Sequence, residues 1–214
     1  MKRRGGDGAS FEKSVFINCP FDEEYLPLLR PLVFTVTLFG FEPRLASLRS
    51  DSAEIRLEKI VALIGRSQYS IHDISRLRAK RAGDFARFNL PFELGVDRGA
   101  QLFGTGKLRS KCCLMLERNQ YDFHRAISDL AGVDIKSHRN EPTDLVRAVR
   151  DWFVETVGLR GVPSATQVWY RFTDFASDFY DARKADGYSD VDLNMMPLPE
   201  YLDFIRSWSS VQAT

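Results

Sequence analysis

Residues 112–116 read Cys-Cys-Leu-Met-Leu and form the most continuous apolar run of the sequence. An uninterrupted run of this kind is typical of a central parallel strand that is covered on both faces. Shorter runs of β-branched and aromatic residues lie on either side of it along the chain. They predict four further strands, at residues 15–17, 41–45, 69–74 and 133–135.

Helical patterns separate these strands. Leu57, Ile60, Val61 and Ile64 recur at the spacing of one helix face, and Ser52 is placed to cap that helix. The other predicted helices are residues 23–38 with Asp22 as cap, residues 92–102, and the stripe Leu145, Val149, Trp152 and Phe153. Strands and helices alternate five times over about 140 residues. This predicts an α/β fold, an open parallel five-stranded sheet with helices on both faces.

The chain divides into segments of different composition. Residues 1–13 predict a flexible tail, residues 14–157 carry the α/β pattern, and residues 158–163 read as a linker. Residues 164–211 form an aromatic-rich helical extension that would leave a large apolar patch if it faced water. Two placements stay open, against the helix of Trp152 in the same chain or across a two-fold interface of a homo-oligomer. The aromatic positions of the extension are Trp169, Phe172, Phe179, Tyr201 and Trp208.

Composition narrows the function classes. The 214 residues include 30 Lys and Arg against 29 Asp and Glu, so the net charge is +1 and no bulk positive field attracts nucleic acid or an anionic membrane. We expect neither partner. No apolar stretch approaches the roughly 18 residues of a membrane span. The three cysteines lack metal-ligand spacing and the N-terminus does not read as a secretion signal, which favours reduced thiols in the cytoplasm and no bound metal.

The predicted topology indicates where a ligand would bind. In an open parallel sheet, ligands lie beyond the carboxyl ends of the strands. Here those ends are residues 18–22, residues 73–76 and the start of the helix that carries Glu93. The candidate substrate-binding residues are Asn18, Pro20, Phe21, Asp22, Ser75, Arg76, Arg87 and Asn89.

Glu93 is the first candidate catalytic residue. Pro91 suits the first position of a helix, which would put Glu93 in the first turn, where the helix dipole favours a carboxylate. Its neighbours Phe92 and Leu94 are apolar, which points to chemistry rather than solvation. A surface glutamate that merely complements the dipole is the alternative.

Asp73, at the end of the third predicted strand, is the second candidate, with an Asx-turn or helix cap as the alternative. His72 beside it is expected to be a hydrogen-bonded interior histidine. A basic loop follows and would either contact a diphosphate or be solvated. Its residues are Arg76, Arg78, Lys80, Arg81 and Arg87. The chain has neither a P-loop nor a dinucleotide-binding Gly-x-Gly-x-x-Gly after its first strand.

Three short motifs carry a family resemblance. They are Val15-Phe16-Ile17-Asn18-Cys19-Pro20-Phe21, Tyr69-Ser70-Ile71-His72-Asp73-Ile74-Ser75, and Leu90-Pro91-Phe92-Glu93-Leu94-Gly95. At these residues the sequence resembles the TIR-like and nucleoside 2-deoxyribosyltransferase-like superfamily of flavodoxin-like domains, over roughly residues 14 to 157. The Asn18-Cys19-Pro20 opening and Leu90-Pro91-Phe92 differ from signalling TIR domains and favour a divergent bacterial branch.

The resemblance implies cleavage of an N-glycosidic bond. Glu93 would serve the anomeric carbon of a ribose, and Asp73 would assist the leaving base. The first hypothesis is an NAD-cleaving hydrolase or cyclase, with NAD as substrate and no cofactor, acting as an assembled, toxic effector in bacterial antiphage defence. The second is a nucleoside or nucleotide 2-deoxyribosyltransferase or nucleotide N-glycosidase. The third is a non-catalytic interaction domain.

The two catalytic hypotheses differ in their need for an acid. The nicotinamide of NAD is already cationic and leaves without protonation, whereas a purine must be protonated, for which Asp73 is the candidate. Both reactions pass through an oxocarbenium-like state that a carboxylate such as Glu93 stabilises.

Overall fold

The computed structural model describes residues 9–48, 51–77, 86–130 and 132–211. Its centre is one five-stranded sheet in the order β2-β1-β3-β4-β5, and all four strand pairs are parallel. The strands are β1 (Ser14–Asn18), β2 (Glu42–Arg44), β3 (Tyr69–Asp73), β4 (Cys112–Glu117) and β5 (Lys136–Ser137). The alternating pattern predicts this open parallel α/β sheet, and its strand order is that of flavodoxin-like folds.

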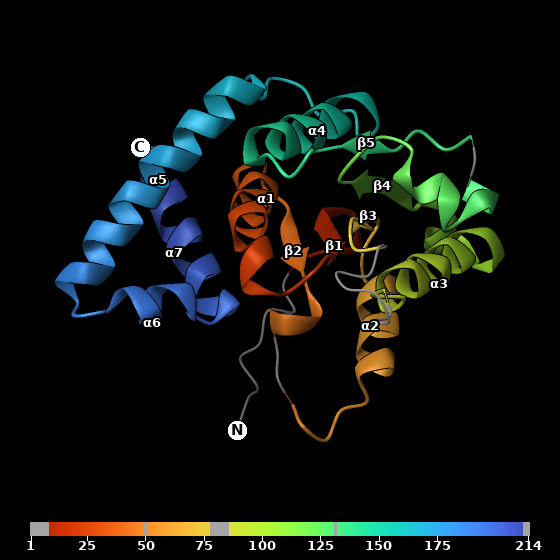
Figure 1. The fold of residues 1–214 in the computed structure, drawn as a ribbon, viewed down its shortest axis with the longest axis horizontal. Helices are drawn as coiled ribbons and strands as arrows, with labels where there is room; N and C mark the ends of the chain where they lie inside the picture. The colour runs from red at the N-terminus through yellow and green to blue at the C-terminus, as the bar shows by residue number, and fades with distance from the viewer. Residues whose placement is uncertain (1–8, 49–50, 78–85, 131, 212–214) are drawn as a thin grey trace.

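Helices cover both faces of the sheet (Figure 1). On one face lie α1 (Leu26–Leu38) and α4 (Pro142–Glu155), and on the other lie α2 (Arg56–Gly65) and α3 (Asn89–Phe103). Short 3-10 turns link these elements, at Phe11–Lys13, Glu23–Tyr25, Ala46–Leu48, Gly106–Ser110, Asp122–Arg125 and Ser128–Leu130. None of the helices in the described part of the chain combines the length and apolar character that a membrane crossing requires.

Alternation along the strands sends neighbouring side chains to opposite faces. Val15 and Ile17 of β1 pack into the large core beneath α1 and α4. Phe16 between them packs with Ile60 and Ile64 of α2. All three β1 side chains are fully buried because each face has its own helix layer.

The first half of the fold differs from the sequence predictions at its helix ends. Asp22 makes no side-chain capping bond, and residues 23–25 form a 3-10 turn before α1. The N-cap of α2 is Ile55 and not Ser52. Of the four apolar residues predicted to form one face of α2, Ile60 and Ile64 are buried, whereas Leu57 and Val61 are 42% and 48% exposed.

Two further boundaries are corrected. The last strand is Lys136–Ser137 and not residues 133–135, since β5 is an edge strand that pairs with only the last two residues of β4. Of the predicted tail, Phe11 is buried and lies in a 3-10 turn. Residues 1–8 of that tail, and the predicted basic residues Arg78, Lys80 and Arg81, lie outside the described residues.

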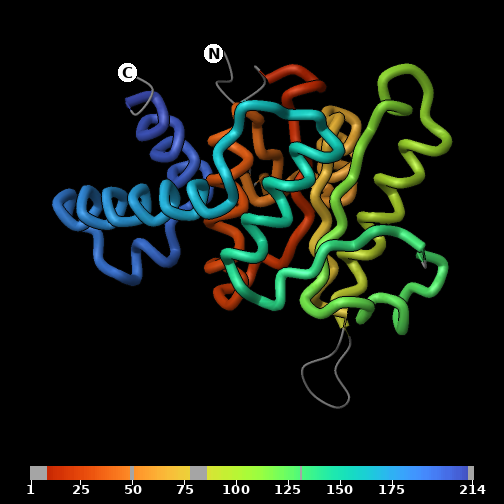
Figure 2. Tube along the Cα trace, turned by 90° about the horizontal axis from the view of Figure 1, so that it is seen from above, coloured from red at the N-terminus to blue at the C-terminus, as the bar shows by residue number. Residues whose placement is uncertain are grey.

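The C-terminal extension packs on its own chain. It comprises α5 (Ala165–Ala185), α6 (Asp190–Asn194) and α7 (Leu198–Val211), and Figures 1 and 2 show it against the α1 side of the sheet. Phe34 of α1 is fully buried beneath it. The ring centroid of Phe34 lies 5.5 Å from Phe172, 5.1 Å from Phe175 and 6.0 Å from Trp208. The extension therefore enlarges the main core rather than forming a core of its own.

Removing the extension should destabilise the α/β domain. A chain cut after Gly161 exposes Phe34, and burial of that one side chain is worth about 2 kcal/mol. We expect the shortened protein to aggregate or to unfold at a markedly lower temperature, as measured by light scattering and thermal unfolding. A monodisperse shortened chain with full-length stability would contradict this account.

Two substitutions on α5, one at a buried and one at an exposed aromatic residue, test whether the buried contacts of the extension stabilise the fold. Phe175 is fully buried, so Phe175→Ala should cost about 3–5 kcal/mol of unfolding free energy. Tyr170 is 61% exposed, so Tyr170→Ala should change it by less than about 0.5 kcal/mol.

Candidate active site

A cavity of about 340 Å³ opens beyond the carboxyl ends of β1 and β3. In this strand order the chain leaves β1 and β3 toward opposite edges of the sheet, and the crevice at that switch point is where ligands bind. The lining residues come from the segment after β1, from the start of α2 and from the approach to α3. They are Cys19, Pro20, Phe21, Arg56, Ala86, Arg87, Phe88, Asn89, Leu90 and Glu93.

Glu93 contributes the carboxylate of this cavity. It is 6% exposed, and burial raises its pKa, while the charge of Arg56 acts in the opposite direction. The predicted position in the first helical turn is wrong. The helix begins at Asn89, two residues before Pro91, so Glu93 is its fifth residue. Burial at the cavity wall therefore determines the state of this carboxylate.

Cys19 lies among three carboxylates. It is 1% exposed, and its pKa is raised well above the ordinary value by burial and then by the negative charges of Asp73, Glu93 and Asp22. A thiol in this environment stays protonated and is a poor nucleophile. The charges of Asp22, Asp73 and Glu93 all act on Cys19. The segments after β1 and β3 and the helix α3 therefore meet at this edge of the sheet.

Asp73 is at the end of β3 but does not line the cavity. Its Oδ2 accepts a hydrogen bond from the Tyr25 hydroxyl at 2.5 Å, and its Oδ1 accepts one from the Ser75 amide at 2.9 Å. The His138 Nε2 lies 3.1 Å from Oδ2 but at an angle outside hydrogen-bond geometry, so this contact is mainly electrostatic.

The protonation of Asp73 follows from these contacts. Burial alone would raise its pKa, but the contacts with His138, Ser75 and Tyr25 outweigh burial and hold the pKa below the usual value. Asp73 is fully buried and ionised near neutral pH. It therefore has no proton to give to a leaving base, which is the role the sequence suggested.

The charged residues at the rim pair with one another. Asp22 forms ion pairs with Arg76, at 3.1 Å, and with Arg87, at 3.2 Å. Arg76 forms a further ion pair with Glu24, at 3.2 Å. Asp22 and Arg76 were expected to bind substrate, but they lie beside the cavity and do not line it. Arg87 both pairs with Asp22 and lines the cavity.

The other expected binding residues fall into two groups. Pro20, Phe21 and Asn89 line the cavity with Arg87. Asn18 is 2% exposed and lies behind the lining, where its side chain contacts the Leu90 carbonyl. Ser75 is half-buried and binds Asp73 through its backbone amide.

Sequence reasoning missed Arg56 and Phe88, which both line the cavity. Arg56 is the first residue of α2, and it makes no hydrogen bond or ion pair with another residue in the described part of the chain. Nothing local to Arg56 indicates that α2 brings it near Glu93. Phe88 is 64% exposed at the mouth, directly before α3, and could have been found as an aromatic neighbour of the Leu90–Gly95 motif.

Asp97 is a buried acid that the sequence analysis also missed, although it follows Glu93 by four residues on the same helix. The Ser70 hydroxyl donates to its Oδ2 at 2.5 Å, and the His72 Nε2 lies 3.0 Å from the same oxygen. The Lys111 ammonium lies 3.0 Å from Oδ1. Burial raises the pKa of Asp97, but the contacts with His72, Lys111 and Ser70 outweigh it and lower the pKa to about 2.

His72, Asp97 and Cys113 bring potential metal ligands within 4.8 Å of one another. The residues around them do not fit a metal site. The Lys111 ammonium already neutralises Asp97, and burial raises the pKa of the Cys113 thiol to about 12. The cluster is a buried salt bridge with an interior histidine, as predicted for His72.

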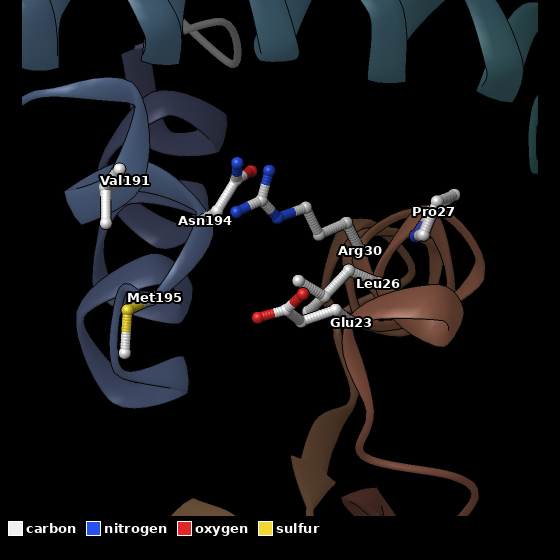
Figure 3. A pocket seen from close by; sticks show the side chains of 7 residues that line it. All are labelled: Glu23, Leu26, Pro27, Arg30, Val191, Asn194 and Met195. Atoms are coloured by element: carbon white, nitrogen blue, oxygen red, sulfur yellow. The ribbon is translucent and has the colours of Figure 1, made fainter.

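A second pocket, of about 380 Å³, lies between the start of α1 and α6 (Figure 3). Its Arg30 guanidinium donates a hydrogen bond to the Leu193 carbonyl at 2.5 Å. Val191 and Met195 on its other wall are 65% and 73% exposed. The pocket is slightly larger than the Glu93 cavity, but Glu23, the carboxylate in its lining, is exposed, so we place the candidate active site at the buried Glu93.

Comparisons with protein-family models, with curated proteins and with solved structures found no match for this chain. The family resemblance drawn from the three short motifs therefore stays a prediction. A functional proposal rests on the cavity, on Glu93 and on the residues that face it.

Asp97 should make stability depend on pH. Because its pKa is about 2 in the folded state against 3.8 ordinarily, the ionised carboxylate stabilises the fold by about 2 kcal/mol above pH 4. This contribution is lost as the pH falls from about 4 toward 2. The free energy of unfolding in urea is measured for the natural protein and for Asp97→Asn. The difference between the two should become smaller as the pH falls from about 4 toward 2. A difference independent of pH would show that Asp97 is not ionised in the folded protein.

Proposed function

We propose that this protein cleaves the N-glycosidic bond of a nucleotide that carries a pyridinium base, with NAD as the substrate to test. The observation that carries the proposal is the buried Glu93 carboxylate in the wall of a cavity at the switch point of the sheet. A carboxylate held there can stabilise positive charge that develops on a ribose.

The other lining residues suit a nucleotide. Phe21 and Phe88 offer aromatic surfaces on which a base can stack, and Arg56 and Arg87 offer guanidinium groups that bind phosphate. A nucleoside would have no use for the two arginines. This favours a nucleotide substrate over the nucleoside of a deoxyribosyltransferase.

The reaction breaks the bond between the ribose C1′ and the pyridinium nitrogen. The bonding electron pair moves to that nitrogen, which neutralises the base, and the positive charge passes to C1′ and the ring oxygen. Glu93 stabilises this oxocarbenium-like state. Water then bonds to C1′ and releases a proton to solvent, which completes hydrolysis, while attack by a nucleophile of the same substrate would give a cyclic product.

The state of the neighbouring acids favours a leaving group that needs no proton. The pKa of Asp73 is below its usual value, so its proton is already lost, and the pKa of the Cys19 thiol is too high for efficient donation. A purine would leave poorly without an acid. Expulsion of neutral nicotinamide from NAD requires none.

One incubation experiment separates the three hypotheses. The protein is mixed with NAD, or with a deoxynucleoside plus a second base, and the products are resolved by chromatography. Free nicotinamide supports the proposal, and base exchange supports the transferase. No turnover of either substrate, also under conditions that promote assembly, would favour an interaction domain. A role as a defence effector would follow only from the first outcome.

Glu93→Gln should abolish turnover without weakening the fold. The substitution keeps the shape and removes the charge, so we expect a loss of at least about a hundredfold in rate. The raised pKa means that the charged form of Glu93 destabilises the folded state at neutral pH, so the unfolding free energy should stay equal or rise.

The control is Glu155→Gln on α4, where the side chain is 60% exposed. It should leave turnover unchanged. Full activity in Glu93→Gln would exclude Glu93 as the essential carboxylate.

Turnover should fall on the acid side with a midpoint above the ordinary glutamate value of 4.5. The ionised form of Glu93 carries the reaction, and burial raises its pKa, so activity is lost as the pH falls through that raised value. Arg56→Gln removes the charge that lowers this pKa and should move the midpoint further upward. Arg171→Gln, on the exposed face of α5, should not move it. Equal midpoints in all three proteins would contradict the assignment.

A further inference from the structure

We propose that a buried polar chain, Lys111–Asp97–His72–Asn18, fixes α3 to the sheet on both sides of Glu93 and thereby positions its carboxylate. The four side chains are between 0% and 3% exposed. The structural part of this inference stands on their contacts alone. Its catalytic consequence rests on the proposed function.

The first anchor lies four residues after Glu93. Asp97 is on α3, whereas Ser70 and His72, which contact its Oδ2, are on β3. Lys111, directly before β4, reaches the other oxygen of Asp97 and also donates to the carbonyls of residues 64 and 67. The middle of α3 is thus joined to β3 and to the chain that enters β4.

The second anchor lies three residues before Glu93. The Asn18 side-chain amide, at the end of β1, donates to the Leu90 carbonyl at 2.9 Å. Its Nδ2 also lies 3.0 Å from the His72 Nδ1. The first turn of α3 is therefore joined to β1, and the two anchors share His72.

The positions of the hydrogen atoms along the four buried polar side chains depend on one another. The Asp97 carboxylate can only accept, so the His72 Nε2 donates to it, and the Leu90 carbonyl can only accept, so the Asn18 amide nitrogen donates to it. The NH₂ group of Asn18 must then face His72, and both of its hydrogens are used, one on His72 and one on the Leu90 carbonyl. The reversed amide would set two oxygens against each other at Leu90. The Leu90 carbonyl thus orients the Asn18 amide, and His72 links this amide to Asp97 through its two ring nitrogens.

The remaining polar atom of Asn18 is its amide oxygen. Its Oδ1 is buried and accepts no hydrogen bond from any residue that the structure describes. Burying an oxygen without a donor is unfavourable. The amide is nevertheless held with that oxygen unpaired, so its two donated bonds determine its position.

The two anchored residues, Leu90 and Asp97, are seven residues apart, or about two helical turns, with Glu93 between them. Losing the Leu90 anchor would free the first turn and let the Glu93 carboxylate move. A displacement of about 1 Å at a reacting group can cost on the order of a hundredfold in rate. Asn18 and His72 are therefore positioning residues that act through α3.

The test compares two variants that each lose buried hydrogen bonds. Asn18→Leu removes both donated bonds at similar size. Thr35→Val is the control, because Thr35 is also fully buried and its hydroxyl donates to the Pro31 carbonyl at 2.7 Å within α1, on the other face of the sheet. In each protein we would measure amide hydrogen exchange along α3, the Glu93 carboxyl titration by NMR, and kcat and KM with NAD.

The Leu94 amide is the reporter, since in an α-helix it donates to the Leu90 carbonyl. In Asn18→Leu we expect this amide to exchange at least about tenfold faster than in Thr35→Val, and the Glu93 titration midpoint to move. We also expect kcat to fall at least about tenfold, with KM changed by less than about threefold. Thr35→Val should show none of these local changes.

Exchange of the Leu94 amide at the control rate in Asn18→Leu would overturn the proposal, even if activity were lost. If the natural protein turns over neither NAD nor a nucleoside, the proposed function fails, while exchange and the Glu93 titration still decide the positioning role. If Asn18→Leu does not fold, the natural protein decides. There the Leu94 amide should exchange as slowly as that of Ile71 in β3, and exchange at the rate of a frayed helix end would overturn the proposal.

Discussion

Helices cover both faces of the parallel sheet, so each polar side chain at the carboxyl ends of β1 and β3 must find its partner inside the protein. Asp73 is matched by Tyr25, His138 and the Ser75 amide. On the other face, Asp97 is matched by Lys111 and by groups of β3. These buried acids are held ionised by their neighbours, and their contacts fix how the layers meet at the crevice.

Strand alternation assigns different roles to the two faces. Asp73 points toward the layer of Tyr25 and α1, whereas Glu93 approaches the crevice from α3. One carboxylate is consequently locked into the fold and the other is left in a cavity wall with a raised pKa. The Glu93 carboxylate can stabilise positive charge there, whereas Asp73 is already ionised and the Cys19 thiol is a weak acid, and the proposed substrate has a leaving group that needs no proton from either.

The largest core and the candidate site lie on opposite faces of the sheet. The C-terminal helices pack around Phe34 on the α1 side and extend the large core. The cavity lies on the side of α2 and α3, where the apolar side chains form two small buried clusters and where Leu57, Phe88 and Phe92 are exposed. Because these clusters are smaller than the core under α1 and α4, polar contacts such as those of Asn18 and Asp97 contribute more to holding α3 in place.

Local patterns were enough to predict the α/β class, a strand at residues 112–116 and a helix that carries Glu93, because apolar runs and helical spacing are local properties. That strand is β4, next to the edge strand β5, and the centre of the sheet is β3. It also indicated an interior His72. The folded chain was needed to show that Arg56 lies near Glu93, that α3 begins before Pro91, and that Asp73 contacts groups up to 65 residues away in the chain, such as His138. Such partners follow from how the layers pack, and no short-range pattern encodes packing between segments so distant along the chain.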